Sequence, residues 1–189
     1  FRPRPDTIVN VRKRYGLEGK YVVLGVATGW SEEVGMSTFF YLRKHLANNF
    51  AIVMVGCTPD ILEKLPQDIV GIARTNNVEE LAELYSAADI LFNGSYQETF
   101  GLVTAEALSC GTPVIVYNAT ACSEIVTNAT GYIAEPRSKE QVLEYILTDS
   151  NFSMEYRQAR SCKCRQYAIE HFDRDKKFQE YVNLYNSLI

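Results

Sequence analysis

The sequence lacks the features that would place the chain in several common classes of protein. It contains no unbroken apolar run of about 18 residues, the length that a membrane-spanning helix requires. No G-x-G-x-x-G element follows the first strand-like segment, which disfavours a dinucleotide-dependent dehydrogenase. The formal net charge is -4, and the 12 tyrosines are not interleaved with basic residues, so nothing indicates a nucleic-acid partner.

Cysteine is too sparse and too unevenly placed to form a disulfide framework. The five cysteines are Cys57, Cys110, Cys122, Cys162 and Cys164. An odd number of thiols, most of them within apolar segments, favours free cysteines in a reducing compartment. Cys162 and Cys164 form a C-x-C pair without a second pair, which disfavours a structural zinc site. We therefore expect a cytoplasmic protein without a metal centre.

Histidine is also scarce, and neither copy suggests acid–base catalysis. His45 and His171 fall in helix-like segments far from the motif described below, and each is interpreted as a surface or packing residue. No Ser/His/Asp or Cys/His arrangement typical of hydrolysis is visible. The chain does have an ordinary share of hydrophobic residues, 47% of 189, which is enough for the core of one domain.

Short apolar segments typical of buried strands alternate with helix-like segments along the chain. The strand-like segments are residues 21–26, 50–56, 69–73, 89–93, 113–117 and 132–134. The helix-like segments are residues 7–15, 36–46, 59–65, 78–87, a stretch beginning near Gly101, 138–148, 152–171 and 173–189. Thr58, Asn77 and Ser138 are the predicted N-caps of three of them. The alternation predicts an α/β fold with a Rossmann-like, doubly wound parallel sheet of about six strands and extra C-terminal helices.

The stretch from Ser95 to Pro113 carries the most informative chemistry. It leaves a predicted strand and enters a predicted helix, and it holds two carboxylates, Glu98 and Glu106. In open parallel sheets, ligands bind at the carboxyl ends of the strands. A helix N-terminus there offers free amides and partial positive charge to a phosphate, and Gly101 lets the backbone approach a ligand closely. Glu98 can accept bonds from sugar hydroxyls, and Glu106 can bind a ribose. The alternative is that Glu98 caps the helix and Glu106 is a solvated helix residue.

The residues from Ala88 to Ile115 resemble the donor-binding half of group 1 glycosyltransferases, which are retaining enzymes of the GT-B fold. The similarity lies in Ser95, in Glu98-Thr99-Phe100-Gly101-Leu102 with Glu106 eight residues after the first glutamate, and in the following Gly-Thr-Pro-Val. It continues in Val53–Gly56, Leu81–Asp89, Ser123–Val126 and Thr130–Ile133. It therefore spans most of residues 20–148.

The resemblance implies a role for each matching position. Glu98 is the catalytic residue and contacts the donor sugar, while Glu106 binds the ribose. Arg74 and Thr75, in the loop after the third strand-like segment, contact the base. The other implied donor-binding residues are Thr28, Gly29, Gly56, Ser95, Thr99, Phe100, Gly101 and Leu102. The implied reaction moves a hexose from a nucleotide diphosphate sugar to a glycan or lipid-linked acceptor, as in bacterial polysaccharide biosynthesis, without a cofactor or a metal.

The loop after the first strand departs from the family pattern. The family carries basic residues there that stabilise the diphosphate, whereas this chain has Ser31-Glu32-Glu33-Val34-Gly35. Three interpretations stay open: Arg74 or another residue substitutes, the donor site is weakened, or the protein is a catalytically lapsed homologue that serves as a binding or scaffold subunit. A sugar-nucleotide epimerase of the same fold is a further, less favoured alternative. Trp30, in this loop, either lines the site or packs under it.

The ends of the chain predict a two-part organisation. Residues 1–172 are expected to form the nucleotide-sugar-binding domain, and residues 173–189 a helix that packs back on an N-terminal domain. That domain, which would bind the acceptor, is expected in a longer polypeptide, because Phe1–Pro5 reads as a linker. The aromatic residues Phe178, Tyr181 and Tyr185 either face that domain or fill the core of this one. We expect the longer protein in the cytoplasm, with peripheral association at the inner face of the membrane left open.

Overall fold

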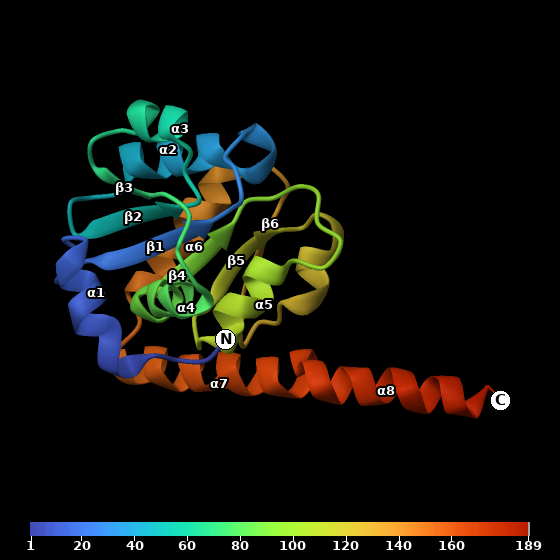
Figure 1. Cartoon of the computed structure of the whole chain (residues 1–189). Helices are drawn as coiled ribbons and strands as arrows, with labels where there is room; N and C mark the ends of the chain where they lie inside the picture. The colour runs from blue at the N-terminus through green and yellow to red at the C-terminus, as the bar shows by residue number, and fades with distance from the viewer. Residues whose placement is uncertain (189) are drawn as a thin grey trace.

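Six parallel strands form the centre of the structure, a computed structural model that describes residues 1–188 (Figure 1). The strands are β1 (Tyr21–Val26), β2 (Phe50–Val55), β3 (Ile69–Ile72), β4 (Ile90–Asn93), β5 (Val114–Tyr117) and β6 (Gly131–Ala134). Their order in the sheet is β3-β2-β1-β4-β5-β6, and every neighbouring pair is parallel. Every residue of β2, β4 and β5 is buried, because helices cover both faces of the sheet. The predicted doubly wound α/β fold is confirmed.

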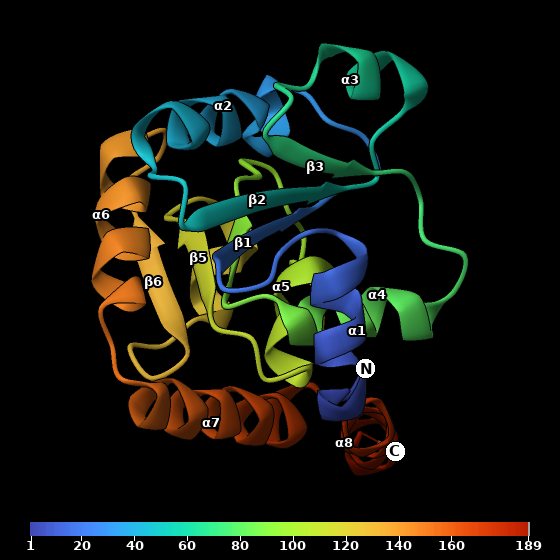
Figure 2. The same ribbon diagram turned by 90° about the vertical axis from the view of Figure 1, so that its left-hand side faces the viewer.

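Helices cover the two faces of the sheet in separate groups (Figure 2). One face carries α1 (Ile8–Arg14), α4 (Val78–Ala87), α5 (Leu102–Ser109) and α7 (Met154–Phe172). The other face carries α2 (Met36–His45), α3 (Pro59–Lys64) and α6 (Lys139–Ser150). The sheet grows from β1 to β2 and β3, and the chain then crosses over to β4 on the other side of β1. A crevice is therefore expected between the carboxyl ends of β1 and β4, where the strand order reverses.

Polar side chains cap the helices largely as the sequence predicts. The Asn77 side chain accepts a hydrogen bond from the amide of Glu80, and the Ser138 side chain accepts one from the amide of Gln141. Thr58 occupies the predicted cap position before α3, but its side chain makes no capping hydrogen bond. Asp173 ends α7 and caps the next helix, so the predicted break at this position is confirmed.

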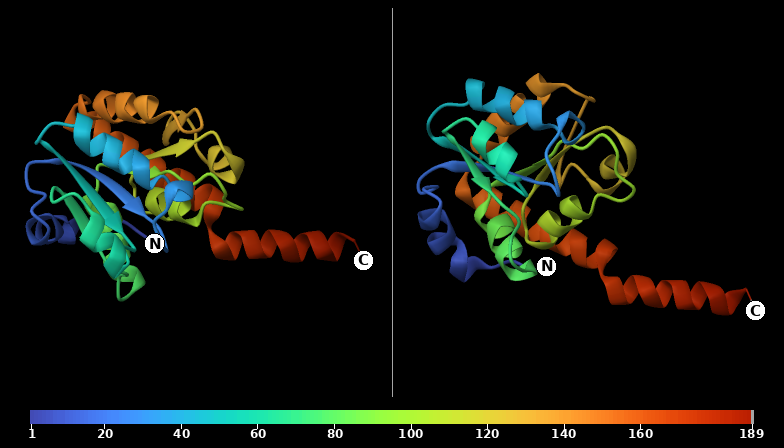
Figure 3. Two further views of the ribbon diagram at one scale, coloured as in Figure 1. Left: turned by 90° about the horizontal axis from the view of Figure 1, so that it is seen from above. Right: turned by 45° about the horizontal axis from the view of Figure 1, so that its top comes forward.

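The last helix, α8 (Arg174–Ser187), projects away from the sheet as a separate rod (Figures 1 and 3). None of its residues is buried. Phe178 is 70% exposed, Tyr181 62% and Tyr185 65%. The interpretation that these side chains fill the core of this domain is therefore wrong, since α8 contributes nothing to either hydrophobic cluster. None of the helices within residues 1–188 has the length and hydropathy needed to cross a membrane.

Ion pairs, one buried and two partly buried, hold the amino edge of the sheet together. Asp89, which precedes β4, accepts hydrogen bonds from the guanidinium groups of Arg12 at 2.8 Å and Arg157 at 3.2 Å. Asp149 at the end of α6 is 1% exposed and pairs with Arg160 of α7, which is 5% exposed. These pairs join both helical layers to the starts of the strands, and each carboxylate is satisfied within the protein.

Candidate functional site

A cleft of about 470 Å³ opens at the carboxyl ends of β1 and β4. Its walls are the loop after β1, the loop after β4 and the first turn of α5. The lining residues are Val26, Ala27, Thr28, Gly29, Trp30, Val34, Phe92, Asn93, Gly94, Ser95, Glu98, Thr99, Phe100, Gly101, Leu102 and Val103. The cleft thus lies where the reversal of strand order predicts a ligand site.

Most of the predicted site residues line this cleft. They are Thr28, Gly29, Ser95, Glu98, Thr99, Phe100, Gly101 and Leu102. Gly56, Arg74, Thr75 and Glu106 are not among its lining residues. The structure therefore brings the residues of the two loops together, while the positions implied for the base and the ribose lie outside the cleft itself. Their roles in binding stay predictions.

Gly101 starts α5 in a conformation that only glycine adopts without strain. Its φ is 87°, and a Cβ atom here would lie 2.9 Å from Sγ of Cys122. No side chain caps the first turn of α5, so its leading amides remain available to a ligand in the cleft. These amides and the helix dipole favour a phosphate or another anion at this end.

The floor of the cleft is a buried polar cluster that sequence reasoning missed. The Asn93 side-chain amide donates to Thr104 Oγ1 at 3.1 Å and to Cys122 Sγ at 3.4 Å. Its oxygen accepts the amide of Ser95 at 3.1 Å, which turns the chain out of β4. Burial raises the pKa of the Cys122 thiol to about 11, so it stays neutral beneath Gly101. The only signal in the sequence is a polar residue at the end of an apolar strand.

Glu98 is held in place through its backbone. Its amide donates to Thr120 Oγ1 at 3.0 Å, which joins the loop after β4 to the 3₁₀ helix Thr120–Ile125. Thr120 has a φ of 52°, an unusual value for a residue with a branched side chain. The Glu98 carboxylate forms no ion pair within residues 1–188, so its oxygens are available to accept hydrogen bonds from a ligand in the cleft.

Glu106 is positioned by a tyrosine on the neighbouring helix. Tyr85 is fully buried in α4, and its hydroxyl donates to Oε2 of Glu106 at 2.9 Å. Burial raises the pKa of the half-buried Glu106 carboxyl, while the bond from Tyr85 opposes this shift. Nothing in the spacing of Tyr85 along the sequence reveals this partner, which lies 21 residues away.

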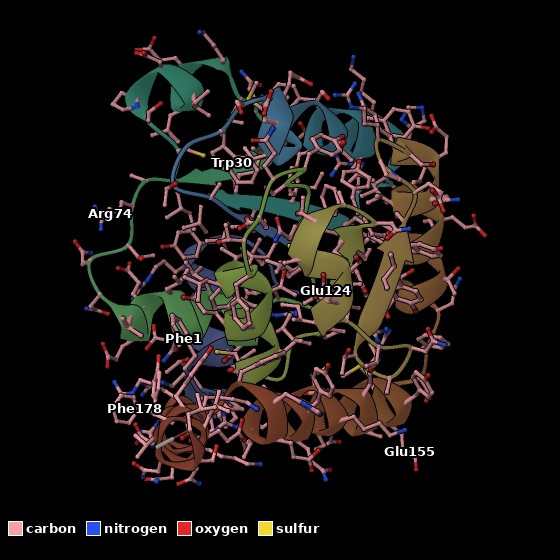
Figure 4. All side chains as sticks on the ribbon, turned by 90° about the vertical axis from the view of Figure 1, so that its right-hand side faces the viewer. Phe1, Trp30, Arg74, Glu124, Glu155 and Phe178 are labelled. Carbon is pink, nitrogen blue, oxygen red and sulfur yellow. The ribbon has the colours of Figure 1, made fainter. Side chains whose placement is uncertain are left out.

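The remaining predicted residues have distinct placements. Gly56 has a φ of 85°, and a Cβ atom there would lie 1.7 Å from the carbonyl oxygen of Ala27, so it allows two loops to approach closely. Arg74 lies on the long loop from β3 to α4 and points away from the sheet, as Figure 4 shows. Trp30 is 8% exposed and donates from Nε1 to the Val55 carbonyl at 3.0 Å. It therefore packs under the cleft and also forms part of its wall.

The cleft is deficient in positive charge, as the sequence predicts. None of its lining residues within residues 1–188 is a lysine or an arginine. Val34 lines it where the family pattern carries a cation, and Glu33 precedes Val34. Arg74 does not line the cleft, so the structure offers no support for a direct substitution by that residue.

Comparison with known proteins agrees with this geometry. The family described as glycosyl transferases group 1 matches residues 19–160. O-antigen chain mannosyltransferase B of Escherichia coli is 41% identical over 69 residues, which are 36% of this chain and 18% of that protein. The crystal structure of Anabaena Alr3699/HepE in complex with UDP and glucose superposes with a TM-score of 0.86 at 19% identity, over 99% of this chain and 54% of that one.

A third similar structure is that of a C-terminal domain alone. The C-terminal domain of the glycosyl transferase group 1 family protein LpcC from Francisella tularensis superposes with a TM-score of 0.74 at 21% identity. The superposition covers 92% of this chain and 96% of that one. This likeness shows that the present chain has the fold of such a C-terminal domain.

These findings identify the family of the chain. Because the family match covers more than half of the 189 residues, the chain belongs to the group 1 glycosyltransferases. Its fold is the Rossmann-like C-terminal half of a GT-B enzyme. The chain spans about half the length of Alr3699/HepE and a smaller share of the E. coli relative.

Proposed function

We propose that this chain is the donor-binding domain of a retaining glycosyltransferase that moves a hexose from a nucleotide diphosphate sugar to a glycan or lipid-linked acceptor. The observation that carries the proposal is the cleft at the start of α5. There, Gly101 exposes free helix amides beside Glu98, in a chain of the group 1 family. The UDP bound to the similar Alr3699/HepE supports a nucleotide diphosphate as the ligand class.

In this proposal each part of the carboxyl edge contacts a different part of the donor. The leading amides of α5 bind the diphosphate, and Glu98 contacts the sugar. Glu106, oriented by Tyr85, accepts the two ribose hydroxyls, and the loop with Arg74 and Thr75 contacts the base. No metal or cofactor takes part, because the helix dipole and the second domain supply the positive charge.

The second domain is the expected source of the acceptor site. The exposed aromatic side chains Phe178, Tyr181 and Tyr185 on α8 form an apolar surface that supports packing of residues 173–189 against such a domain. The isolated chain should accordingly bind donor weakly and transfer nothing. We propose that the longer protein acts in the cytoplasm, and peripheral contact with the inner face of the membrane would bring it to a lipid-linked acceptor.

Calorimetry on the full-length protein tests the proposal. UDP, GDP and their hexose conjugates are titrated into the wild type and into Glu106→Gln. We expect one of the two nucleotides to bind, and the substitution to weaken binding about tenfold because the ribose loses a charged acceptor. Absence of binding by all these ligands contradicts the proposal.

A second candidate is a catalytically lapsed homologue that serves as a binding or scaffold subunit. The absence of lysine and arginine from the cleft lining favours it. Replacing Glu33 with Arg and Val34 with Lys in one variant should raise donor affinity if the site geometry survives. Turnover by the unaltered full-length enzyme at a rate of about 1 per second or more, a normal enzymatic rate, rules this candidate out. A sugar-nucleotide epimerase is less favoured and would release an altered donor without any acceptor.

A further inference from the structure

The loops at the carboxyl edge of the sheet contain many more acidic residues than basic ones. The loops that follow the six strands contain five glutamates, namely Glu32, Glu33, Glu98, Glu124 and Glu135. The same loops contain two arginines, Arg74 after β3 and Arg137 after β6, and β3 and β6 are the outer strands of the sheet. Apart from the free amides at the start of α5, these two arginines are the only positive groups that the loops of this edge within residues 1–188 offer to a negatively charged ligand.

Arg137 is directed from the outer strand toward the loop that lines the cleft. Its guanidinium carbon lies 5.3 Å from the centroid of the Tyr96 ring. Tyr96 directly follows Ser95, a lining residue, and its amide donates to the carbonyl of Glu33 at 3.0 Å. The arginine side chain thus reaches from the end of β6 to the loop after β4, next to the cleft, although neither Arg137 nor Tyr96 is among the residues that line it.

The surface beneath Arg137 is rigid. The Tyr96 ring stacks on Tyr117 with centroids 5.1 Å apart and an interplanar angle of 12°. Tyr117 is fully buried at the end of β5, and its hydroxyl forms a hydrogen bond with Thr38 Oγ1 at 3.0 Å. A guanidinium that packs over an aromatic ring and not in an ion pair keeps its N–H groups free for a carboxylate or a phosphate.

Two further observations separate Arg137 from an ordinary surface arginine. Its φ is 65°, in the left-handed region that favours glycine. Within residues 1–188, one other residue that is not glycine has a positive φ, namely Thr120, whose hydroxyl oxygen accepts the hydrogen bond from the Glu98 amide. Strained backbone of this kind concentrates at functional sites. Arg137 also forms no ion pair within those residues, although Glu135 lies two positions away.

We propose that Arg137, which packs over the Tyr96 ring, forms an anion subsite beside the donor cleft, on its β6 side. The subsite recognises a carboxylate or a phosphate carried by the sugar portion of a substrate. This inference rests on the proposed function, in which the base lies on the β3 side near Arg74 and the sugar lies at Glu98. A group on the β6 side therefore belongs to the transferred sugar or to the acceptor.

Two calorimetric series on the full-length protein test the subsite and distinguish its two sources. The first compares UDP-glucose with UDP-glucuronic acid, and GDP-mannose with GDP-mannuronic acid, so that each pair differs by one carboxylate. The second titrates glucose, glucuronic acid and glucose 6-phosphate into protein saturated with the nucleotide that binds. We expect the acidic ligand of one series to bind about tenfold more tightly than its neutral partner. A preference in the first series places the anion on the donor, and one in the second series places it on the acceptor.

Variants at position 137 make the assignment specific. Arg137→Gly should abolish the preference for the acidic ligand, and the melting temperature should not fall, because glycine relieves the left-handed backbone. Arg137→Asn, which also tolerates this backbone, is the second variant if the first folds poorly. Lys139→Ala removes the nearby cation at the start of α6 and should leave the preference intact.

The outcomes separate this inference from the function on which it rests. If UDP or GDP binds but neither series shows a preference that depends on Arg137, the subsite is wrong and the donor-binding function stands. If neither the nucleotides nor their sugar conjugates bind, both proposals fall. An equal loss of preference in Lys139→Ala also overturns the subsite, because the effect would then be general electrostatics.

Discussion

The two edges of the sheet use charge in opposite ways. At the amino edge, Asp89 and Asp149 lie in ion pairs with arginines, and Asp149 with its partner Arg160 is almost entirely buried. At the carboxyl edge, the Glu98 carboxylate and the Arg137 guanidinium form no ion pair within residues 1–188. The same six strands supply both edges, so the difference lies in the loops and helices attached to them.

We interpret this contrast as a division between charge that stabilises the fold and charge that remains available to the proposed ligand. A buried carboxylate with its partners present is satisfied, and removing one partner leaves an uncompensated charge. The carboxyl edge instead keeps free helix amides, exposed carboxylates and positive φ values at Thr120 and Arg137. Substitutions at the amino edge should therefore change stability, and those at the carboxyl edge should change binding and catalysis.

The largest effect is expected for Arg160→Leu at the amino edge. This change leaves Asp149 buried without its partner, and we expect a loss of about 3–5 kcal/mol in the free energy of unfolding. Urea denaturation of the chain measures it. Arg174→Leu is the matched control, since Arg174 pairs with Asp175 on the exposed surface of α8 and should change stability by about 0.5 kcal/mol or less. If Arg160→Leu and Arg174→Leu are equally stable, the ion pair of Asp149 does not stabilise the amino edge, and the proposed difference between the two edges is wrong.

The next effect belongs to Glu98→Gln at the carboxyl edge. If Glu98 stabilises charge in the transition state, the rate of sugar transfer by the full-length enzyme should fall by about 10²–10³-fold. The free energy of unfolding should change by about 0.5 kcal/mol or less, because the position makes only backbone hydrogen bonds. A stopped assay of transfer, paired with thermal unfolding, measures both. If the variant is destabilised but transfers sugar at the normal rate, Glu98 stabilises the fold and has no catalytic role.

Gly101→Ala tests whether the glycine at the start of α5 is required for stability and nucleotide binding. The added methyl group would sit at a φ of 87° and 2.9 Å from Sγ of Cys122, so we expect a loss of about 1–3 kcal/mol in stability and weaker nucleotide binding. Gly29→Ala is the control for stability, because a Cβ atom there meets nothing within 4 Å. Thermal unfolding and nucleotide titration of both variants check the prediction. If Gly29→Ala is the more damaging change, the helix start is not the constrained element.

Tyr85→Phe should have the smallest effect, on the orientation of Glu106. Losing the hydroxyl should weaken nucleotide affinity by about 1 kcal/mol, and Tyr145→Phe, which removes an exposed hydroxyl, should not. The bond from Tyr85 lowers the pKa of Glu106, so its removal raises that pKa further. Binding that needs the carboxylate is lost as the pH falls through this pKa, and in the variant the loss should begin at a higher pH. If nucleotide affinity depends on pH identically in the wild type and in Tyr85→Phe, the Glu106 carboxylate does not bind the ribose.

Local patterns in the sequence predicted the strands, most caps and the central loop. The strands are continuous apolar runs because both faces are covered. The central loop stands out because Glu98 and Glu106 lie eight residues apart with Gly101 between them. The bond from Tyr85 to Glu106 and the stack of Arg137 on Tyr96 could not be predicted, because each joins segments that only the fold brings together. The sequence also does not decide whether the aromatic side chains of α8 are buried in this domain or exposed, since helical spacing does not reveal which surface they cover.

A structure of the protein with bound nucleotide tests the contrast between the edges most directly. Crystals soaked with UDP or GDP at millimolar concentration should show the diphosphate within hydrogen-bond distance of the amides of Leu102 and Val103, beside Glu98. The cavity at the amino edge, which Arg157 and Arg160 line, should remain free of nucleotide. A nucleotide at that amino-edge cavity, or none at the start of α5 in the full-length protein, would contradict the assignment of the donor site.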